Sequence, residues 1–380
     1  MNISKVKKNT AGKNAAGRGV TVIALICLLL LMCTVLFGCK SSNNVAEIEN
    51  GSGKVVGEID QKLMSLIMSV SNSQLGAEAY AGTDIWNTTY PGSDKTVKDI
   101  VVAQARAYAV GLLQAEQLCD TVYGSGLSKE QISFVDSYID ELTTVYGGAK
   151  GFESVLSSYG TDIEALKRYM LLVIKRDAVY KTLYTQETGT RYPDIQSAKK
   201  DYFAKNFFVE DHILIKYSGG TKADGTEIPL SPEQQQAKRE AANALYAEIQ
   251  NGVRTFDEAL AEFGEDTYVL GYPFGYFISR DFDWSGMPSV VQSAVREMTE
   301  GEIRFVDAET GAYIVRKNQM NPELYKSNGN FDLYLESTIA QEDFLLQCEY
   351  AGDVNVDEEL LAELDPENIP AFDMSLLGQE

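Results

Sequence analysis

Histidine is almost absent from this chain. Only one of the 380 residues, His212, is a histidine. A zinc site built on two or more histidines is therefore excluded. A Ser/His/Asp or Cys/His hydrolase is also disfavoured, because no nucleophile in a recognisable elbow motif accompanies His212. The lone histidine opens a strand-like run, His212-Ile213-Leu214-Ile215, so it belongs to a folded element.

Acidic residues are absent from the N-terminus, which has the organisation of an export signal. Basic residues between Lys5 and Arg18 precede Val20–Phe37, a run without charge, glycine or proline. A charged leader, an apolar stretch and a small residue before a cleavage site make a signal peptide. Cys39 directly after Gly38 resembles the bacterial lipobox, in which the cysteine is lipidated and becomes the first mature residue. We therefore expect residues 1–38 to be a lipoprotein signal peptide.

An uncleaved transmembrane anchor is the alternative interpretation of this leader, since 18 mostly apolar residues are just long enough to span a bilayer. Both interpretations place most of the chain outside the cytoplasm. We expect a protein that is lipid-anchored to the cell membrane, on its extracytoplasmic face.

Basic residues are scarce throughout. The chain has 33 Lys and Arg against 55 Asp and Glu, a formal charge of −22. Without the five basic residues of the leader, 28 remain against the same 55, a formal charge of −27. Such a surface repels nucleic acid and anionic lipid. We therefore expect no nucleic-acid partner, and unfolded basic polypeptides or cations remain compatible with this charge.

Cysteine is also sparse. Of five cysteines, Cys27 and Cys33 lie in the leader and Cys39 is the expected lipidation site. Cys119 and Cys348 remain. They are either paired in a disulfide, as the extracytoplasmic location allows, or buried as two small hydrophobic side chains.

Composition and periodicity divide the rest of the chain. Residues 39–54 are polar and predict a tether, whereas 55–208 are mainly of helical period, including a charged connector helix. Residues 209–320 alternate short strands with helices, which predicts an α+β domain. A helix is expected within 321–350. The final segment, 351–380, has nine acidic residues and no Lys or Arg, so we expect a solvated, partly mobile tail.

A series of short motifs runs in order through residues 209–320. They are His212-Ile213-Leu214-Ile215, Phe263-Gly264-Glu265-Asp266, Phe274-Gly275-Tyr276-Phe277, Met287 to Met298 with Val291, Glu300-Gly301-Glu302-Ile303, and Thr310-Gly311-Ala312-Tyr313. Their order and spacing resemble those of a parvulin-type (PpiC-like) peptidyl-prolyl isomerase domain. The resemblance implies a small antiparallel sheet surrounded by helices.

The resemblance also implies candidate site residues. His212, Asp266 and Tyr313 fall on the catalytic positions, and Tyr313 replaces the second histidine of the family. A Tyr hydroxyl can donate a hydrogen bond but cannot share a proton as an imidazole does. The substrate-binding positions are Phe277, Met287, Val291, Met298 and Thr310. Val291 stands where the family usually has Phe, which shrinks the apolar wall around proline.

The chemistry that this domain implies needs no cofactor, metal or nucleophile. Rotation about a peptide bond has a barrier of about 18–20 kcal/mol. An apolar site that desolvates the X–Pro imide and holds it twisted lowers that barrier. His212 and Asp266 would set the polarity beside the bond.

The preceding helical region carries a second resemblance. Gly147-Gly148, Phe152, Leu156, Tyr159-Gly160-Thr161 and Leu166 are similar to the N-terminal chaperone region of extracytoplasmic foldases of the PrsA and SurA types. In those foldases the isomerase is inserted between N-terminal helices and a returning C-terminal helix, here Leu324 to Tyr350. The implied partners are unfolded or newly secreted polypeptides with X–Pro bonds, and a homodimer through the helical domains.

We therefore expect a lipid-anchored foldase that binds exported unfolded polypeptides and catalyses prolyl cis/trans isomerisation. Tyr313 and Val291 favour an alternative, a non-catalytic holdase chaperone with a degenerate parvulin domain. A solute-binding lipoprotein is a second alternative that fits the leader equally well, but 209–320 is too short for the two α/β lobes of such proteins.

Overall fold

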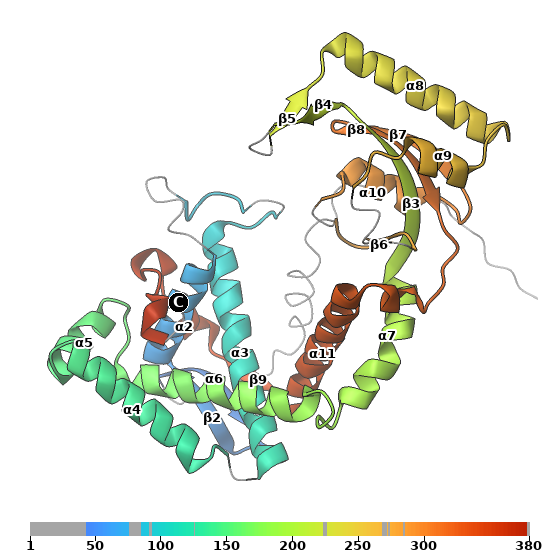
Figure 1. Cartoon of the computed structure of the whole chain (residues 1–380). Coiled ribbons are helices and arrows are strands. Elements are labelled where there is room, and N and C mark those ends of the chain that lie inside the picture. The colour runs from blue at the N-terminus through green and yellow to red at the C-terminus, as the bar shows by residue number, and fades with distance from the viewer. Residues whose placement is uncertain are drawn as a thin grey trace, which may run out of the picture.

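The computed structural model describes residues 43–75, 85–90, 93–124, 126–222, 226–267, 272, 274–283 and 286–377. The expected signal peptide and Cys39 lie outside these residues. Figure 1 shows a mainly helical part and an α+β part, with two long helices running side by side between them. The predicted α+β class is confirmed, because helices are combined with small antiparallel sheets. Within the described residues no helix is both long and apolar enough to cross a membrane.

Five helices build most of the helical part, and their apolar faces form one core. Thr96 and Ser128 begin two of them with capping boxes, in which the N-cap hydroxyl and the N3 side chain each bond the other residue's backbone N–H. The helices are α2 (Gln61–Gln74), α3 (Val97–Tyr123), α4 (Lys129–Val145), α5 (Ala149–Ser157) and α6 (Ile163–Tyr184).

A three-stranded antiparallel sheet packs against the helices of the helical part and shares their core. Its strands are β1 (Asn44–Glu49), β2 (Val55–Asp60) and β9 (Val354–Val356), in the order β2-β1-β9. The prediction of a tether over 39–54 is therefore wrong for its described portion. Val45 and Ile48 of β1 are at most 1% exposed. β1 is the central strand: it pairs with β2, which follows it directly, and with β9 from the far end of the sequence, a partner that local composition does not reveal.

The C-terminal segment is folded as well. It contains α12 (Glu358–Ala362) and the 3₁₀ turns η4 (Pro366–Asn368) and η5 (Met374–Leu377). The prediction of a solvated tail is wrong for the residues up to Leu377. Acidic residues such as Glu367 face solvent, but Leu361, Ile369, Phe372 and Leu376 are at most 7% exposed and join the core of the helical part.

The two parts are joined through α7 (Tyr192–Asn206) and α11 (Gly329–Ala351), the neighbouring long helices of Figure 1. Lys199 of α7 lies with its Nζ 2.7 Å from Asp332 Oδ1 of α11. Asp343 of α11 accepts hydrogen bonds from the Tyr184 hydroxyl at 2.6 Å and from Arg191 Nη2 at 2.7 Å. These contacts hold the predicted returning helix against the connector.

Cys119 of α3 and Cys348 of α11 are both buried and free. They belong to the same apolar cluster, which links α3, α6, α7 and α11. Of the two interpretations of this pair, the structure shows buried small side chains.

The α+β part is built on a four-stranded antiparallel sheet of order β6-β3-β8-β7. Its strands are β3 (Phe207–Lys216), β6 (Tyr276–Ser279), β7 (Ile303–Ala308) and β8 (Gly311–Lys317), and a separate ribbon pairs β4 (Ser218–Thr221) with β5 (Glu227–Pro229). Helices α8 (Pro232–Gln250) and α9 (Phe256–Phe263) cover one face of the sheet, where Ile213 and Ile314 point. Helix α10 (Ser289–Glu297) covers the other, where Leu214 and Val315 point.

Candidate functional site

His212 lies on the face of the sheet that α10 covers. Side chains alternate along a strand, so Glu210, His212 and Leu214 of β3 share one face. Leu214 packs in the cluster beneath α10, together with Ile278 of β6 and Tyr313 of β8. The same alternation brings Tyr276 of β6 to this face. The sheet thus places a histidine, a glutamate and two tyrosines from three neighbouring strands side by side.

Both ring nitrogens of His212 face carboxylates. Nδ1 lies 3.0 Å from Glu210 Oε1, and Nε2 lies 3.2 Å from Asp266 Oδ2. The hydroxyl of Tyr276 donates to Asp266 Oδ2. An imidazolium donates through both nitrogens, whereas a neutral imidazole donates through only one. This geometry therefore favours the charged form of His212.

Burial and charge act in opposite directions on this histidine, whose side chain is 4% exposed. Burial disfavours the charged imidazolium, but the carboxylates of Glu210 and Asp266 outweigh it and raise the pKa of His212 to about 10. Burial also raises the pKa of Glu210, which has no exposed surface. Burial, and then the hydrogen bond to Asp266, raises the pKa of Tyr276. The cluster therefore holds its protons more tightly than the same groups would in water.

Aromatic rings surround His212. Its ring centroid is 4.8 Å from that of Tyr276 and 5.3 Å from that of Tyr313. Tyr272 stacks on Tyr276, with centroids 4.5 Å apart and an interplanar angle of 25°. Tyr272 and Tyr276 keep partial exposure, so they form the accessible edge of an otherwise buried cluster.

The structure brings together the three predicted catalytic residues, since His212 contacts both Asp266 and Tyr313. Thr310 is adjacent, with its Oγ1 3.4 Å from the Tyr313 hydroxyl. Sequence reasoning missed Glu210 and Tyr276. The alternation of β3 was the available signal for Glu210, which lies two residues before His212 on the same strand.

The predicted apolar wall is largely interior. Met287, Val291 and Met298 pack in one cluster with Tyr313, but Val291 is 0% and Met298 3% exposed. Only Met287 keeps partial exposure. Val291 and Met298 thus build the core beneath α10, and only Met287 is open to a ligand in this conformation.

Phe277 is a correction to the predicted site. It follows Tyr276 on β6, and the strand alternation turns its side chain to the opposite face. There it packs against Phe203 and Phe331, with ring centroids 5.0 and 4.5 Å away. Phe277 is therefore part of the apolar cluster that joins α7, α11 and the sheet, and it does not line the His212 site.

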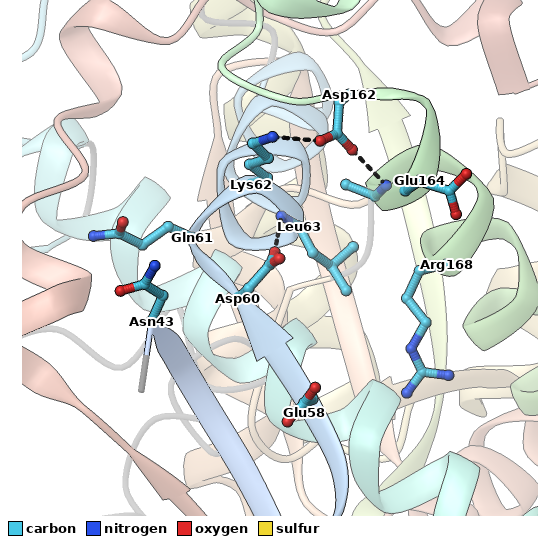
Figure 2. Close-up of a pocket in the computed structure, with 10 residues that line it drawn as sticks. Asn43, Glu58, Asp60, Gln61, Lys62, Leu63, Asp162, Glu164 and Arg168 are labelled. Atoms are coloured by element: carbon cyan, nitrogen blue, oxygen red, sulfur yellow. Dashed lines mark hydrogen bonds and ion pairs between the residues drawn. The ribbon is translucent and has the colours of Figure 1, made fainter. Parts of the chain in front are cut away.

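An open cavity of about 470 Å³ lies in the helical part, where residues at the start of α2 and α6 line it (Figure 2). Asp60 accepts a hydrogen bond from the Leu63 backbone N–H, and Asp162 accepts from the Ala165 backbone N–H and binds Lys62 at 2.6 Å. These polar groups cap α2 and α6, so they are already used by the fold. The described residues contain no group of three His, Cys, Asp or Glu side chains arranged to hold a metal ion.

No family model matches the chain, and no curated protein matches it. Among solved structures it is similar to three PrsA proteins. The PrsA of Bacillus subtilis has 15% identity over 69% of this chain and 84% of that one, with a TM-score of 0.24. The peptidylprolyl isomerase PrsA of Bacillus anthracis has 16% identity over 68% of this chain and 97% of that one, with a TM-score of 0.23. The foldase protein PrsA of Streptococcus pneumoniae strain Canada MDR_19A has 14% identity over 87% of this chain and 97% of that one, also with a TM-score of 0.23. These values describe a remote resemblance, which carries no activity over to this chain.

Proposed function

We propose that this chain is an extracytoplasmic, lipid-anchored foldase that binds exported unfolded polypeptides and catalyses prolyl cis/trans isomerisation. One observation supports the catalytic part above all. Tyr276 of the edge strand β6 keeps a partly exposed ring, which lies 4.8 Å from the ring of His212, and its hydroxyl donates to Asp266, the partner of His212. Such an arrangement offers a substrate an aromatic surface and a polar, proton-holding pair at one place.

Each group has a role in the proposed reaction. The planar X–Pro imide is stabilised by resonance, which is lost as the bond twists. A ring surface such as Tyr276 and Tyr272 desolvates the bond and packs against the pyrrolidine ring, which favours the less polar twisted state. Asp266 accepts the hydrogen bond of the Tyr276 hydroxyl, and His212, paired with Asp266, fixes the polarity beside it. No covalent intermediate is required.

A holdase without isomerase activity is the second candidate. The burial of Val291 and Met298 favours it, because of the three predicted wall residues on the α10 side only Met287 keeps partial exposure. In that case the α+β part would serve as a binding module alone.

A proline-isomerisation assay on the chain from Ser41 onward separates the two candidates. We expect acceleration by the parent, and a loss of about tenfold or more in His212→Ala and Asp266→Asn, about 1.4 kcal/mol or more in the barrier. The matched control is Asp257→Asn on α9, whose side chain is 76% exposed and pairs with Arg316 outside the cluster. No acceleration by the parent would leave the holdase. Unchanged rates in both site variants would keep the enzyme and reject these two residues.

Membrane anchoring is tested separately. Cys39→Ala removes the expected lipidation site, so we expect the chain to move from the membrane fraction to the soluble fraction. A variant that stays fully membrane-bound would favour the uncleaved anchor.

A further inference from the structure

Residues 365–377 pack against α2 and α4 of the helical part, and α2 meets them with small polar side chains. We call the surface of α2 and α4 that this segment covers the groove. Ser65, Ser69 and Asn72 follow at helical spacing on one face of α2. All three are at most 3% exposed, in a helix that is otherwise largely apolar on its buried sides. A buried polar row on such a helix requires hydrogen-bond partners, because an unmet polar group costs free energy.

The partners are main-chain groups of other segments. Ser65 Oγ donates to the Tyr159 carbonyl at 2.9 Å. Ser69 Oγ donates to the Pro370 carbonyl at 2.6 Å, and Asn72 Nδ2 donates to the Ile369 carbonyl at 2.9 Å. Two of the three polar side chains therefore bind the backbone of the C-terminal segment, which is irregular at this point.

Two more contacts extend this pattern. The Phe372 backbone N–H donates to the Ser69 carbonyl at 3.1 Å. The hydroxyl of Tyr138 on α4 donates to the Ser375 carbonyl at 3.3 Å. None of these hydrogen bonds depends on which side chains the bound segment carries. The groove therefore recognises an extended or irregular backbone largely independently of sequence.

Apolar side chains supply the rest of the contact. Ile369, Phe372 and Leu376 are buried at spacings of three and four residues, and the Phe372 ring lies 4.9 Å from that of Tyr159. The apolar surface continues beyond the segment along α4. There Phe134 stacks on Tyr138 at 6.4 Å and is 61% exposed.

The beginning of this segment combines one buried residue, Pro366 of η4, with exposed ion pairs. Lys98 Nζ lies 2.8 Å from Asp365 and 3.6 Å from Glu367, and all three side chains are 36–38% exposed. Ion pairs of this exposure contribute little stability, with a median of about 0–1 kcal/mol. Asn72 also keeps a buried Oδ1 without a hydrogen-bond partner among the described residues, so the groove can accept one more backbone N–H than the segment supplies.

We propose that this groove binds extended segments of unfolded polypeptides, and that residues 365–377 occupy it in cis as a displaceable competitor. The suitable partner is an irregular or extended segment with apolar or aromatic side chains three and four residues apart. This inference rests on the proposed binding of unfolded chains but does not require isomerase activity. A tethered competitor has an effective concentration on the order of millimolar, so only tight or abundant clients displace it.

The test uses the full chain with substitutions that weaken the attachment of residues 365–377. Phe372→Asp places a charge against Tyr159, and Lys98→Glu turns the ion pairs with Asp365 and Glu367 into repulsion without touching the core. Two probes are used, a fluorescent synthetic peptide of residues 365–377 and a permanently unfolded, reduced and alkylated protein. Phe372→Asp should bind each probe about tenfold more tightly than the parent, and Lys98→Glu about two- to fivefold because its ion pairs are weak, with the peptide and the unfolded protein competing.

Two controls match these changes. Leu333→Asp alters an apolar residue of α11 that is 64% exposed, and Lys62→Glu reverses a charge whose partner is Asp162 in the cavity of Figure 2. Neither should change the affinity for the probes. If Phe372→Asp fails to fold, Lys98→Glu alone decides the question.

Equal binding of the unfolded protein by parent and Lys98→Glu overturns the proposal, as does binding of the peptide without competition. Both results leave the isomerase assay unaffected. Conversely, suppose that the protein shows no isomerase activity while its variants still bind the unfolded protein more tightly than the parent. That result supports binding in the groove and removes only the catalytic part of the proposed function.

Discussion

Glu210 and His212 are two residues apart on β3, and their side chains meet on the same face of the sheet, with Oε1 of Glu210 3.0 Å from Nδ1 of His212. The glutamate has no exposed surface. A buried carboxylate is stable only beside a compensating charge or hydrogen bond. The pair therefore makes the protonation of the histidine part of the folded structure.

Glu210→Gln should lower the pKa of His212 from about 10 toward 6.5, because the substitution removes the main opposing charge but keeps the shape. The chain has a single histidine, so one imidazole resonance in an NMR titration reports the value directly. Asp257→Asn is the control, since Asp257 pairs with Arg316 on the surface. An unchanged titration in Glu210→Gln would show that Asp266 alone holds the proton.

The α+β part should lose stability as the pH rises. The folded pKa of His212 lies above its unfolded value of 6.5, so its stabilising contribution is complete below pH 6.5 and disappears as the pH approaches about 10. Glu210, whose pKa burial raises, contributes with the same sign at lower pH. Thermal unfolding of the parent between these pH values should therefore show a falling midpoint, and His212→Gln should flatten the slope. Parallel slopes in both proteins would contradict the assignment.

Phe277→Ala should destabilise the protein by about 3–5 kcal/mol, the usual cost of emptying a buried aromatic site. Its ring packs between Phe203 and Phe331, so the loss appears in urea unfolding and not in the isomerisation rate of the folded protein. Phe274→Ala is the control, because that ring is 57% exposed and its loss should change stability by about 0.5 kcal/mol or less. A selective loss of activity in Phe277→Ala would return Phe277 to the site.

Cys119 and Cys348 should resist alkylation at about pH 8 until the protein unfolds. Burial raises the pKa of both thiols, that of Cys348 to about 12, so little thiolate forms. The melting temperature should be the same with and without a reducing agent. A lower value in the reduced protein would show that the pair had been oxidised to a disulfide.

Local patterns predicted much of the fold. Capping boxes at Ser128, Ser231 and Thr255 begin α4, α8 and α9. These elements follow from interactions within a few residues. His212, Asp266 and Tyr313 were also expected to meet, and they do.

Other features depend on which face of an element is buried. Tyr276 and Phe277 are neighbours in sequence, and only the placement of β6 at the edge of the sheet turns Tyr276 to His212 and Phe277 to the helices. Val291 and Met298 carry the composition of a ligand wall, yet their side chains turn from α10 and its C-terminus into the core. A sequence pattern shows that a side chain is apolar, but it does not show whether that side chain contacts a ligand or packs in the core.

By itself, the sequence determined the α+β class, most helix and strand positions and the exclusion of multi-histidine chemistry, because periodicity, caps and composition act locally. Tertiary structure alone decided that Glu210 holds His212, that β1 pairs with β9, and that the acidic C-terminal segment lies in the groove of α2. Each of these contacts depends on which strands pair with each other or on which face of a helix is buried. Their energies come from burial and hydrogen bonding, which exist only once distant segments have been brought together.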